Sequence, residues 1–257
     1  MKIEHYSPSG SLKPYIKTFM IIESEHGVEN RLLPDTSVAL AFRLSGDMTY
    51  TAEGNTYNLP SAVITGLRKS PRMVRYSAQT SNLIVLFKEG GAAAFFKEPI
   101  HELFGKSISL DELIPRNKLN QIEEQLNEAN NNYKRIQKAE DFFLSLLRNQ
   151  KEDKLVDHAI QKINMANGNI SIKNLANILS LSQDPFEKRF RRMVGISPKK
   201  FSSIVRLKNL IKNYSPTENL TSIAHTAGYF DQAHFIKDFE SFTGQPPLQF
   251  FKTSSWW

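Results

Sequence analysis

The stretch that decides the fold is FEKRFRRMVGISPKKF at residues 186–201, which returns as FIKDFESFTGQPPLQF at residues 235–250. Six of the 16 positions are identical without a gap, and each identical pair is 49 residues apart. The identical residues of the first copy are Phe186, Lys188, Phe190, Gly195, Pro198 and Phe201. Such a repeat indicates that one supersecondary unit occurs twice in series.

The first copy completes a pattern of helix, turn and helix. Ser171 is a good N-cap for a helix with apolar residues through Leu179, and Ser182 is a good N-cap for the next, over 183–194. Pro185 falls in the first turn of that second helix, where proline is tolerated. Its apolar stripe faces the core, and its opposite face carries Asp184, Glu187, Lys188 and Arg191. A major groove accepts a helix with one buried stripe and one polar stripe.

The second unit repeats this pattern. We expect Thr221 to cap its first helix, Gly228 to form the turn with a positive φ, and Asp231 to cap the next helix. Adding 49 to the first polar face gives Ala233, Ile236, Lys237 and Glu240, with Gln232 and His234 near the entering end. Pro198 opens a long helix between the two units. A continuous helix there would hold the units about one DNA turn, roughly 34 Å, apart.

The positive charge lies close to the first unit. Residues 1–153 hold 19 Lys/Arg and 19 Asp/Glu, whereas residues 154–257 hold 14 and seven, which accounts for the whole net charge of +7. Nine of the basic residues lie within 183–212. A basic helix alone is usually a solvated face, but here it coincides with a helix-turn-helix pattern, which favours phosphate binding.

The N-terminal region predicts a small β-barrel or sandwich. Runs rich in β-branched and aromatic residues alternate with turn signals such as Ser45-Gly46-Asp47. The expected strands are Ile16–Ile22, Val38–Leu44, Met48–Ala52, Ala62–Thr65, Val74–Ala78 and Leu83–Phe87. Arg43, Arg68, Arg72, Arg75 and Lys88 lie in or beside these strands. They are either pocket residues for an anion or ordinary surface residues.

Helical periodicity begins after the strands. Apolar residues at helical spacing predict amphipathic helices over 117–130 and 133–149, with a turn at Asn130–Asn132. These helices either pack on the barrel or present a stripe to a second copy of the chain. We therefore divide the chain into a β-rich domain (1–115), a helical segment (116–152) and an all-α domain (153–257). The fold class is α+β.

From Lys154 to Phe251 the chain resembles the AraC/XylS family of bacterial transcription regulators. The resemblance rests on Leu175-Ala176, Phe186-x-x-x-Phe190 and Gly195-x-Ser197-Pro198 in the first unit, and on Arg206-Leu207 in the helix that follows it. It rests in the second on Ile223-Ala224-x-x-Ala227-Gly228-Tyr229, Asp231-Gln232-x-His234-Phe235 and Gly244-x-Pro246-Pro247. The N-terminal half is similar in layout to the cupin-like sensor barrels that precede this module.

The resemblance implies an effector-responsive, sequence-specific DNA-binding regulator with two helix-turn-helix subdomains joined by a helix. The residues assigned to base readout are Gln183, Asp184, Glu187, Lys188, Gln232, Ala233, Ile236 and Lys237. Those assigned to phosphate contacts are Ser182, Arg191, Arg192 and His234. The partners implied are promoter DNA, and RNA polymerase for an activator. A small-molecule effector and a homodimer are left open, as are the effector site and its residues.

Several residues depart from the family pattern. Ser180 stands where glycine is usual in the first turn, and Ile236 and Glu240 replace small polar and basic residues. Asp231, Asp238 and Glu240 against Lys237 leave the second recognition helix acidic. We therefore expect the first unit to supply most of the affinity for DNA.

Other chemistry finds little support. The chain has no cysteine, which excludes disulfides and thiolate chemistry, and its six histidines form no His-x-His or His-x-x-x-His pair. We predict no enzyme activity, no metal and no cofactor. The N-terminus lacks the apolar run of a signal peptide, and no run could span a bilayer, so we expect a cytoplasmic protein that does not contact membranes. The alternatives are a ligand-binding barrel whose C-terminal helices oligomerise, and a non-specific architectural DNA-binding protein.

Overall fold

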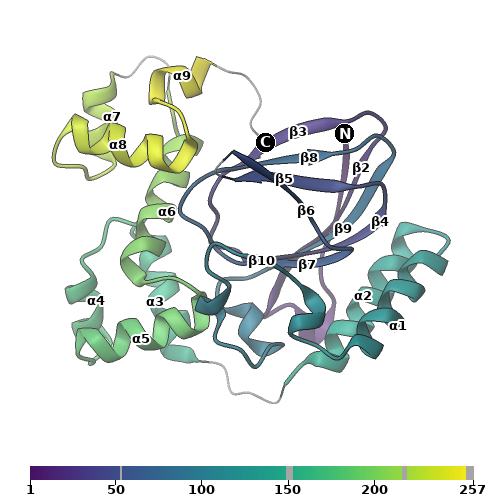
Figure 1. Ribbon diagram of the computed structural model, residues 1–257. Helices are drawn as coiled ribbons and strands as arrows, with labels where there is room; N and C mark the ends of the chain where they lie inside the picture. Colours follow the sequence, from purple (N-terminus) through teal and green to yellow (C-terminus); the bar gives the residue numbers. More distant parts are fainter. Residues whose placement is uncertain (53, 149–152, 216–218, 253–257) are drawn as a thin grey trace.

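A computed structural model describes residues 1–52, 54–148, 153–215 and 219–252 (Figure 1). The β-rich domain, the helical pair and the all-α domain follow one another along the chain, as the sequence predicts. The link from Gln150 to residue 152, at the predicted domain boundary, lies outside the described residues.

The strands of the N-terminal domain form two facing sheets. The larger has the order β1-β2-β9-β4-β7-β10 and the smaller β3-β8-β5-β6, and the paired strands within them are antiparallel. The bounds are β1 Lys2–Tyr6, β2 Ile16–Ser24, β3 Val28–Leu32, β4 Ala39–Ser45, β5 Met48–Ala52, β6 Asn55–Asn58, β7 Ala62–Thr65, β8 Arg72–Tyr76, β9 Thr80–Phe87 and β10 Ser107–Ser109. Among the described residues the two sheets are not joined into one hydrogen-bonded barrel.

Side-chain alternation along β9 separates two cores. Leu83, Val85 and Phe87 point to a large core, whereas Ile84 belongs to a smaller cluster between the two sheets. The smaller cluster consists of Ala41, Met48, Leu59, Val63, Val74, Tyr76 and Ile84. The space between the sheets is thus lined by apolar side chains from both of them.

Two helices, α1 (Arg116–Glu128) and α2 (Asn132–Leu146), join the larger core. The Phe142 ring meets that of Phe42 edge-on with centroids 5.9 Å apart, and Phe143 meets Phe87 at 5.7 Å. Asn131 caps α2 by accepting a hydrogen bond from the Lys134 N–H at 2.9 Å. The apolar stripes of the two helices are therefore buried within the chain. A homodimer stays a prediction, and it would have to form through a different surface.

The all-α domain holds two helix pairs at opposite ends of a long helix (Figure 1). The bounds are α3 Lys154–Met165, α4 Ile172–Ile178, α5 Gln183–Val194, α6 Pro198–Lys212, α7 Leu220–Thr226, α8 Gln232–Thr243 and α9 Pro247–Lys252. At about 1.5 Å per residue, the 15 residues of α6 span roughly 22 Å. Pro198 occupies the first turn of α6, as predicted, and Ser197 caps the helix.

The β-rich domain contacts both helix pairs. Near the first pair, α5 packs against two short 3₁₀ helices, η2 (Gly91–Ala94) and η3 (Ile100–Leu103). Near the second pair, the Arg31 guanidinium donates to the Thr243 carbonyl at 3.3 Å. Between them, Lys208 of α6 forms an ion pair with Asp35 at 2.7 Å. The interface therefore includes α5, α6 and the end of α8.

Candidate nucleic-acid interface

The first recognition helix, α5, buries most of its apolar stripe. Phe186 and Phe190 have no exposed surface, and Val194 has 1%. The Phe190 ring meets Phe186 on one side and Phe201 of α6 on the other, with centroids 5.9 and 5.5 Å apart. Burying aromatic side chains on this scale holds α5 firmly against α6. Gly195 ends the helix with φ of 99°, a conformation that suits glycine.

The residues predicted to contact DNA lie on the opposite face of α5. Most of them are exposed, namely Ser182, Gln183, Asp184, Lys188, Arg191 and Arg192. Glu187 is half-buried and accepts a hydrogen bond from the Gln183 amide at 2.8 Å. Ser182 stands at the N-cap position, but its hydroxyl makes no capping bond, so that its side chain is not used by the helix itself.

The second recognition helix, α8, follows the same plan with different chemistry. Phe235 and Phe239 have no exposed surface, and the Phe239 ring meets Phe250 at 5.4 Å. Of the predicted contact residues, Gln232, Ala233, His234 and Lys237 are exposed. Ile236 is half-buried and packs against the core, so less of it is available to a partner than the sequence suggests.

The acidic residues of α8 have partners within the protein. Asp231 accepts a hydrogen bond from the His234 N–H at 2.7 Å and so caps the helix, as predicted. Asp238 lies 3.8 Å from the Arg206 guanidinium and 3.7 Å from His234 Nε2. These contacts compensate part of the negative charge that we expected to repel phosphate, although Glu240 remains exposed.

Arg206 of α6 organises the second unit, and the sequence did not reveal this role. Its guanidinium stacks over the Tyr229 ring at 4.2 Å while it faces Asp238. Tyr229 is 4% exposed, and burial raises its pKa to about 12. An arginine can stack and pair at once because its guanidinium is planar. The Arg206-Leu207 dipeptide was part of the family pattern, but only the fold shows what the arginine contacts.

One predicted cap was wrong. The N-cap of α7 is Asn219, whose side chain accepts from the Ser222 N–H at 2.8 Å. Thr221 lies inside the helix, and its hydroxyl donates to the Gln232 side chain at 2.9 Å. Asparagine is as good an N-cap as threonine, and it begins the helix two residues earlier. Ser171 caps α4 and Gly228 has φ of 77°, both as predicted.

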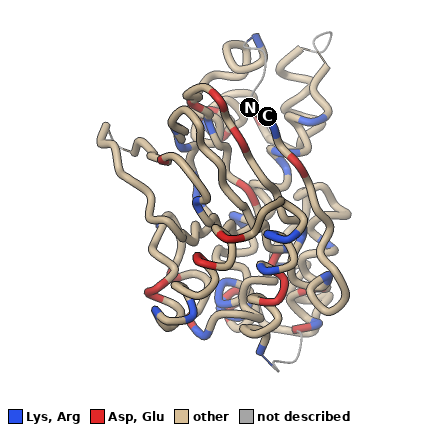
Figure 2. The backbone as a smooth tube through the Cα atoms, turned by 90° about the vertical axis from the view of Figure 1, so that its right-hand side faces the viewer, with Lys and Arg blue, Asp and Glu red and all other residues tan. Residues whose placement is uncertain are grey.

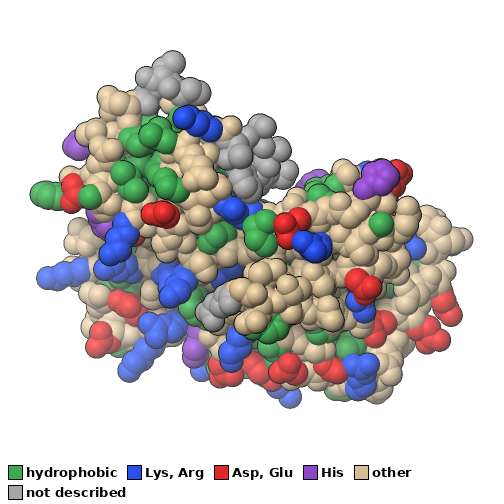
Figure 3. Space-filling view, turned by 45° about the horizontal axis from the view of Figure 1, so that its top comes forward, with side chains coloured by type: hydrophobic (Ala, Val, Ile, Leu, Met, Phe, Trp, Pro, Cys, Tyr) green, Lys and Arg blue, Asp and Glu red, His purple; other side chains and the backbone are tan. Residues whose placement is uncertain are grey.

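Basic side chains gather around the first unit. Figure 3 shows Lys and Arg clustered below the lobe formed by α7, α8 and α9, and few on that lobe. In the β-rich domain, acidic and basic residues are interspersed along the strands (Figure 2). The field that would attract phosphate is therefore concentrated near α5, as the charge count predicts.

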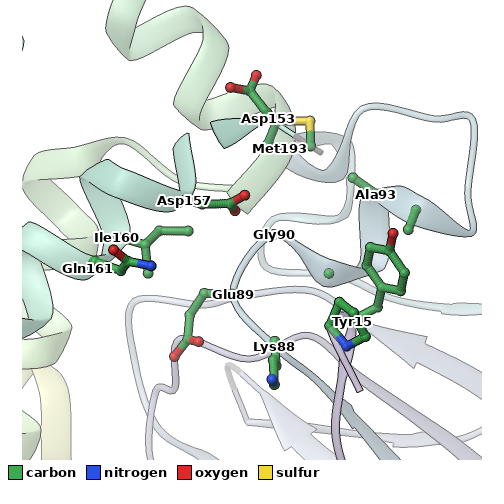
Figure 4. Close-up of a pocket in the computed structure, with 13 residues that line it drawn as sticks. Tyr15, Lys88, Glu89, Gly90, Ala93, Asp153, Asp157, Ile160, Gln161 and Met193 are labelled. Carbon is green, nitrogen blue, oxygen red and sulfur yellow. The ribbon is translucent and has the colours of Figure 1, made fainter. Parts of the chain in front are cut away.

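A groove of about 280 Å³ lies where the two domains meet (Figure 4). Asp153 and Asp157 line it from α3 and its N-cap, and Tyr15, Lys88 and Glu89 line it from the β-rich domain. Asp153 accepts a hydrogen bond from Arg189 of α5 at 2.6 Å, and Glu89 accepts one from Thr36 at 2.8 Å. The walls of the groove thus come from the β-rich domain, from α3 and from α5, the first recognition helix. Of the arginines and lysine considered for an anion pocket, only Lys88 lines it.

Arg68 and Arg72 are tied down elsewhere. Arg68 donates to the Leu32 and Leu33 carbonyls, and burial lowers its pKa to about 10. Arg72 stacks over the Tyr50 ring at 4.1 Å and donates to the Ser107 hydroxyl. Arg43 and Arg75 form ion pairs with Asp47 and Glu29.

The described residues contain neither a candidate membrane span nor a candidate metal site. None of their helices has both the length and the apolar character needed to cross a bilayer. They contain no group of three or more His, Cys, Asp or Glu side chains arranged to hold a metal ion.

The chain matches two family models. Residues 4–109 match a domain of unknown function, DUF6597, and residues 175–253 match a helix-turn-helix domain. An uncharacterized HTH-type transcriptional regulator of Haemophilus influenzae is 32% identical over 87 residues, which are 33% of this chain and 28% of that protein. Residues 175–253 thus match a helix-turn-helix domain, in agreement with the resemblance to the AraC/XylS family that the sequence shows. The match spans less than a third of the curated relative, whose name describes a regulator and not an enzyme.

Two solved structures that resemble this chain share little sequence with it. ToxT from Vibrio cholerae is 12% identical, with a TM-score of 0.47, over 99% of this chain and 100% of that one. The C-terminal domain of AraT, a response regulator from Geobacillus stearothermophilus, is 21% identical over 40% of this chain and 88% of that one, with a TM-score of 0.37.

Proposed function

We propose that the protein is a sequence-specific DNA-binding transcription regulator. The observation that carries the proposal is the pairing of two helix-turn-helix units, each with a fully buried phenylalanine stripe and an exposed polar face. Any surface helix exposes a polar face to water, but two such faces, each on the second helix of a helix-turn-helix unit, also fit neighbouring major grooves. We propose no catalytic activity.

Base readout is assigned to the first turns of α5 and α8. In α5 we assign Gln183, Asp184, Glu187 and Lys188, with phosphate contacts from Ser182, Arg191 and Arg192. In α8 we assign Gln232, Ala233, Ile236 and Lys237, with His234 on phosphate. Exposure supports most of this set, and the half-burial of Glu187 and Ile236 limits those two to contacts at the edge of the face.

The β-rich domain is proposed to sense a small-molecule effector. Its support is the interface that joins this domain to α5, α6 and the end of α8 through Ile100, Asp35 and Arg31. A ligand that changed this interface would change how freely the two recognition helices adjust to neighbouring grooves. The class of effector and its site stay unassigned, as do homodimer formation and contact with RNA polymerase.

The test is selection of bound duplexes from random DNA by the full chain, followed by binding measurements at several salt concentrations. A specific regulator prefers its selected site by about 10³-fold or more over random duplex, and its affinity falls as salt rises. Equal affinity for all sequences would favour an architectural protein. Absence of salt-sensitive binding would favour a barrel whose helices only oligomerise.

A matched pair of variants sharpens the test. Replacing Lys188, Arg191 and Arg192 together by alanine removes three exposed charges from α5, whereas Lys118→Ala removes one exposed charge from α1. The triple variant should lose specific binding and reduce the salt dependence, since each phosphate contact contributes to the slope. The Lys118 variant should match the unmodified protein in both measurements.

A further inference from the structure

The two helix-turn-helix units differ by one residue in the turn. The first helices, α4 and α7, start 48 residues apart, whereas α5 and α8 start 49 residues apart. Ser180 and Gly228 hold equivalent positions with φ of 56° and 77°. The next residues, Leu181 and Tyr229, donate through their N–H groups to Ala176 and Ala224 at 3.0 Å in both cases. The second unit therefore contains one extra residue before its N-cap.

The extra residue is Phe230. In the first unit Leu181 is followed at once by the N-cap Ser182, whereas Phe230 stands between Tyr229 and the N-cap Asp231. Tyr229 is 4% exposed and fills the core position, which leaves Phe230 with 97% of its surface exposed. All the other phenylalanines of the chain are buried or half-buried. An exposed ring forgoes the stabilisation that burial would supply, so packing does not account for it.

The position of Phe230 relates it to α8. It directly precedes Asp231 and the exposed first-turn residues Gln232 and Ala233, at the end of the helix that enters a major groove in this motif. Lys237 is the only Lys or Arg within α8, so this helix has little charge with which to hold DNA. Apolar groups in a major groove contact the C5-methyl group of thymine.

We propose that Phe230 is a specificity residue that contacts thymine methyl groups in the half-site read by α8. This inference rests on the proposed DNA-binding function. It gives the second unit an apolar contribution to recognition, in place of the basic one that α5 supplies to the first. In the first unit, the residue before the N-cap of α5 is Leu181, and its side chain packs against the core. The first unit therefore has no exposed apolar side chain equivalent to Phe230.

The experiment uses the duplex selected by the full chain and replaces each thymine of the site, one at a time, by deoxyuridine. This change removes only the C5-methyl group. For the unmodified protein, at least one replacement in the half-site read by α8 should weaken binding about fourfold. This factor of about four corresponds to the free energy of withdrawing one methyl-sized group from water. Phe230→Ala should bind the thymine duplex about fourfold more weakly and should show no further loss on that replacement.

Two control variants accompany this measurement. Phe230→Leu keeps an apolar side chain and should retain part of the thymine preference. Met165→Ala removes a side chain that is 79% exposed at the end of α3, and its deoxyuridine profile should match that of the unmodified protein. Since Phe230 is almost fully exposed, its replacement should leave the fold intact, which circular dichroism would check.

The outcomes separate this inference from the proposed function. If the unmodified protein selects no site at all, the regulator proposal fails. If it selects a site and Phe230→Ala binds it with unchanged affinity and an unchanged deoxyuridine profile, the thymine contact is overturned. Unchanged DNA binding with lost activation of transcription in vitro would assign Phe230 to a protein partner and would equally overturn it.

Discussion

Lys208 of α6 and Asp35 of the β-rich domain form an ion pair across the domain interface, with Nζ 2.7 Å from Oδ1. Asp35 also accepts a hydrogen bond from the Thr36 N–H. Burial acts to raise the pKa of Asp35, but the charge and hydrogen bond of Lys208 outweigh it, and the pKa lies below its usual 3.8. The pair is half-exposed and joins α6 to the β-rich domain.

We expect Lys208→Met to lower the free energy of unfolding by about 0.5 kcal/mol at pH 7, the value typical of a partly exposed pair. A carboxyl group whose pKa is lowered by folding stabilises the folded state at pH values above its unfolded-state pKa, near 3.8. This stabilisation is lost as the pH falls through the folded-state pKa. The difference between the two proteins should therefore shrink below about pH 4. Urea unfolding at pH 7 and pH 3 measures it.

Asp35→Asn serves as the partner variant, because asparagine keeps the shape and can still accept from Thr36. The double variant Asp35→Asn with Lys208→Met should lose less stability than the sum of the two single losses. In 1 M NaCl the coupling should be smaller, since salt screens exposed charges. Strict additivity at low salt would show that the two side chains do not stabilise the interface together.

Unequal contributions of the two recognition helices are the second prediction. Lys188→Ala or Arg191→Ala should weaken binding to the selected duplex by about 1–3 kcal/mol if the side chain contacts a base. Lys237→Ala should cost less, because the field around α8 is weaker and partly acidic. A mobility shift assay compares the three variants with Lys118→Ala. A larger loss for Lys237→Ala than for both α5 variants would contradict the ranking.

Alternation and helical periodicity predicted the elements that build the cores. The strands β2, β4, β5, β7, β8 and β9 and the helices α1 and α2 appear within a few residues of their expected positions. The strands β1, β3, β6 and β10 were not predicted. β6 shows why: all four residues from Asn55 to Asn58 are exposed, so no apolar alternation marks them.

Features that depend on neighbours far along the chain could not be predicted. The stacking of Arg206 on Tyr229 joins residues 23 positions apart in sequence, and the Lys208–Asp35 pair joins residues 173 positions apart. The extra residue at Phe230 was hidden for another reason. The ungapped repeat begins inside the recognition helices, at Phe186 and Phe235, so it does not include the turns before them. The change of offset within the turn became visible only with the helix bounds.

The two turns differ in backbone strain, which gives the third prediction. Ser180 adopts φ of 56°, a left-handed conformation that disfavours residues with a Cβ atom. Ser180→Gly should therefore raise the free energy of unfolding by about 0.5–1 kcal/mol. Thermal or urea unfolding of the full chain measures the change.

The matched variant is Gly228→Ala in the second turn. Gly228 has φ of 77°, and an added Cβ would lie 2.7–2.8 Å from the side chain of Asn169. Its free energy of unfolding should fall, by about 1 kcal/mol or more. If Ser180→Gly also destabilised the protein, the hydroxyl of Ser180 would be contributing an interaction that outweighs the strain.

Ionisation of Tyr229 gives the last prediction. Burial raises the pKa of this phenol to about 12, against an ordinary value of 10.0. A group whose pKa is higher in the folded than in the unfolded state contributes its full stabilisation at pH values below the unfolded-state pKa. That contribution is lost as the pH rises through the folded-state pKa. The stability attributable to Tyr229 should thus decline between about pH 10 and pH 12. Tyr229→Phe has no ionisable group, so its free energy of unfolding should decline less over this range.

The same substitution tests the packing beneath Arg206. The Tyr229 hydroxyl is buried without a well-formed hydrogen bond, so Tyr229→Phe should be as stable at pH 8 or up to about 1 kcal/mol more stable. Tyr133→Phe, at a position that is 65% exposed, should follow the unmodified protein at every pH. Urea unfolding of the three proteins at pH 8 and pH 11 compares them. A loss of stability in Tyr229→Phe at pH 8 would mean that the hydroxyl bonds to Arg206 or Asp238, and the ring would then be held to α6 by that bond as well as by stacking.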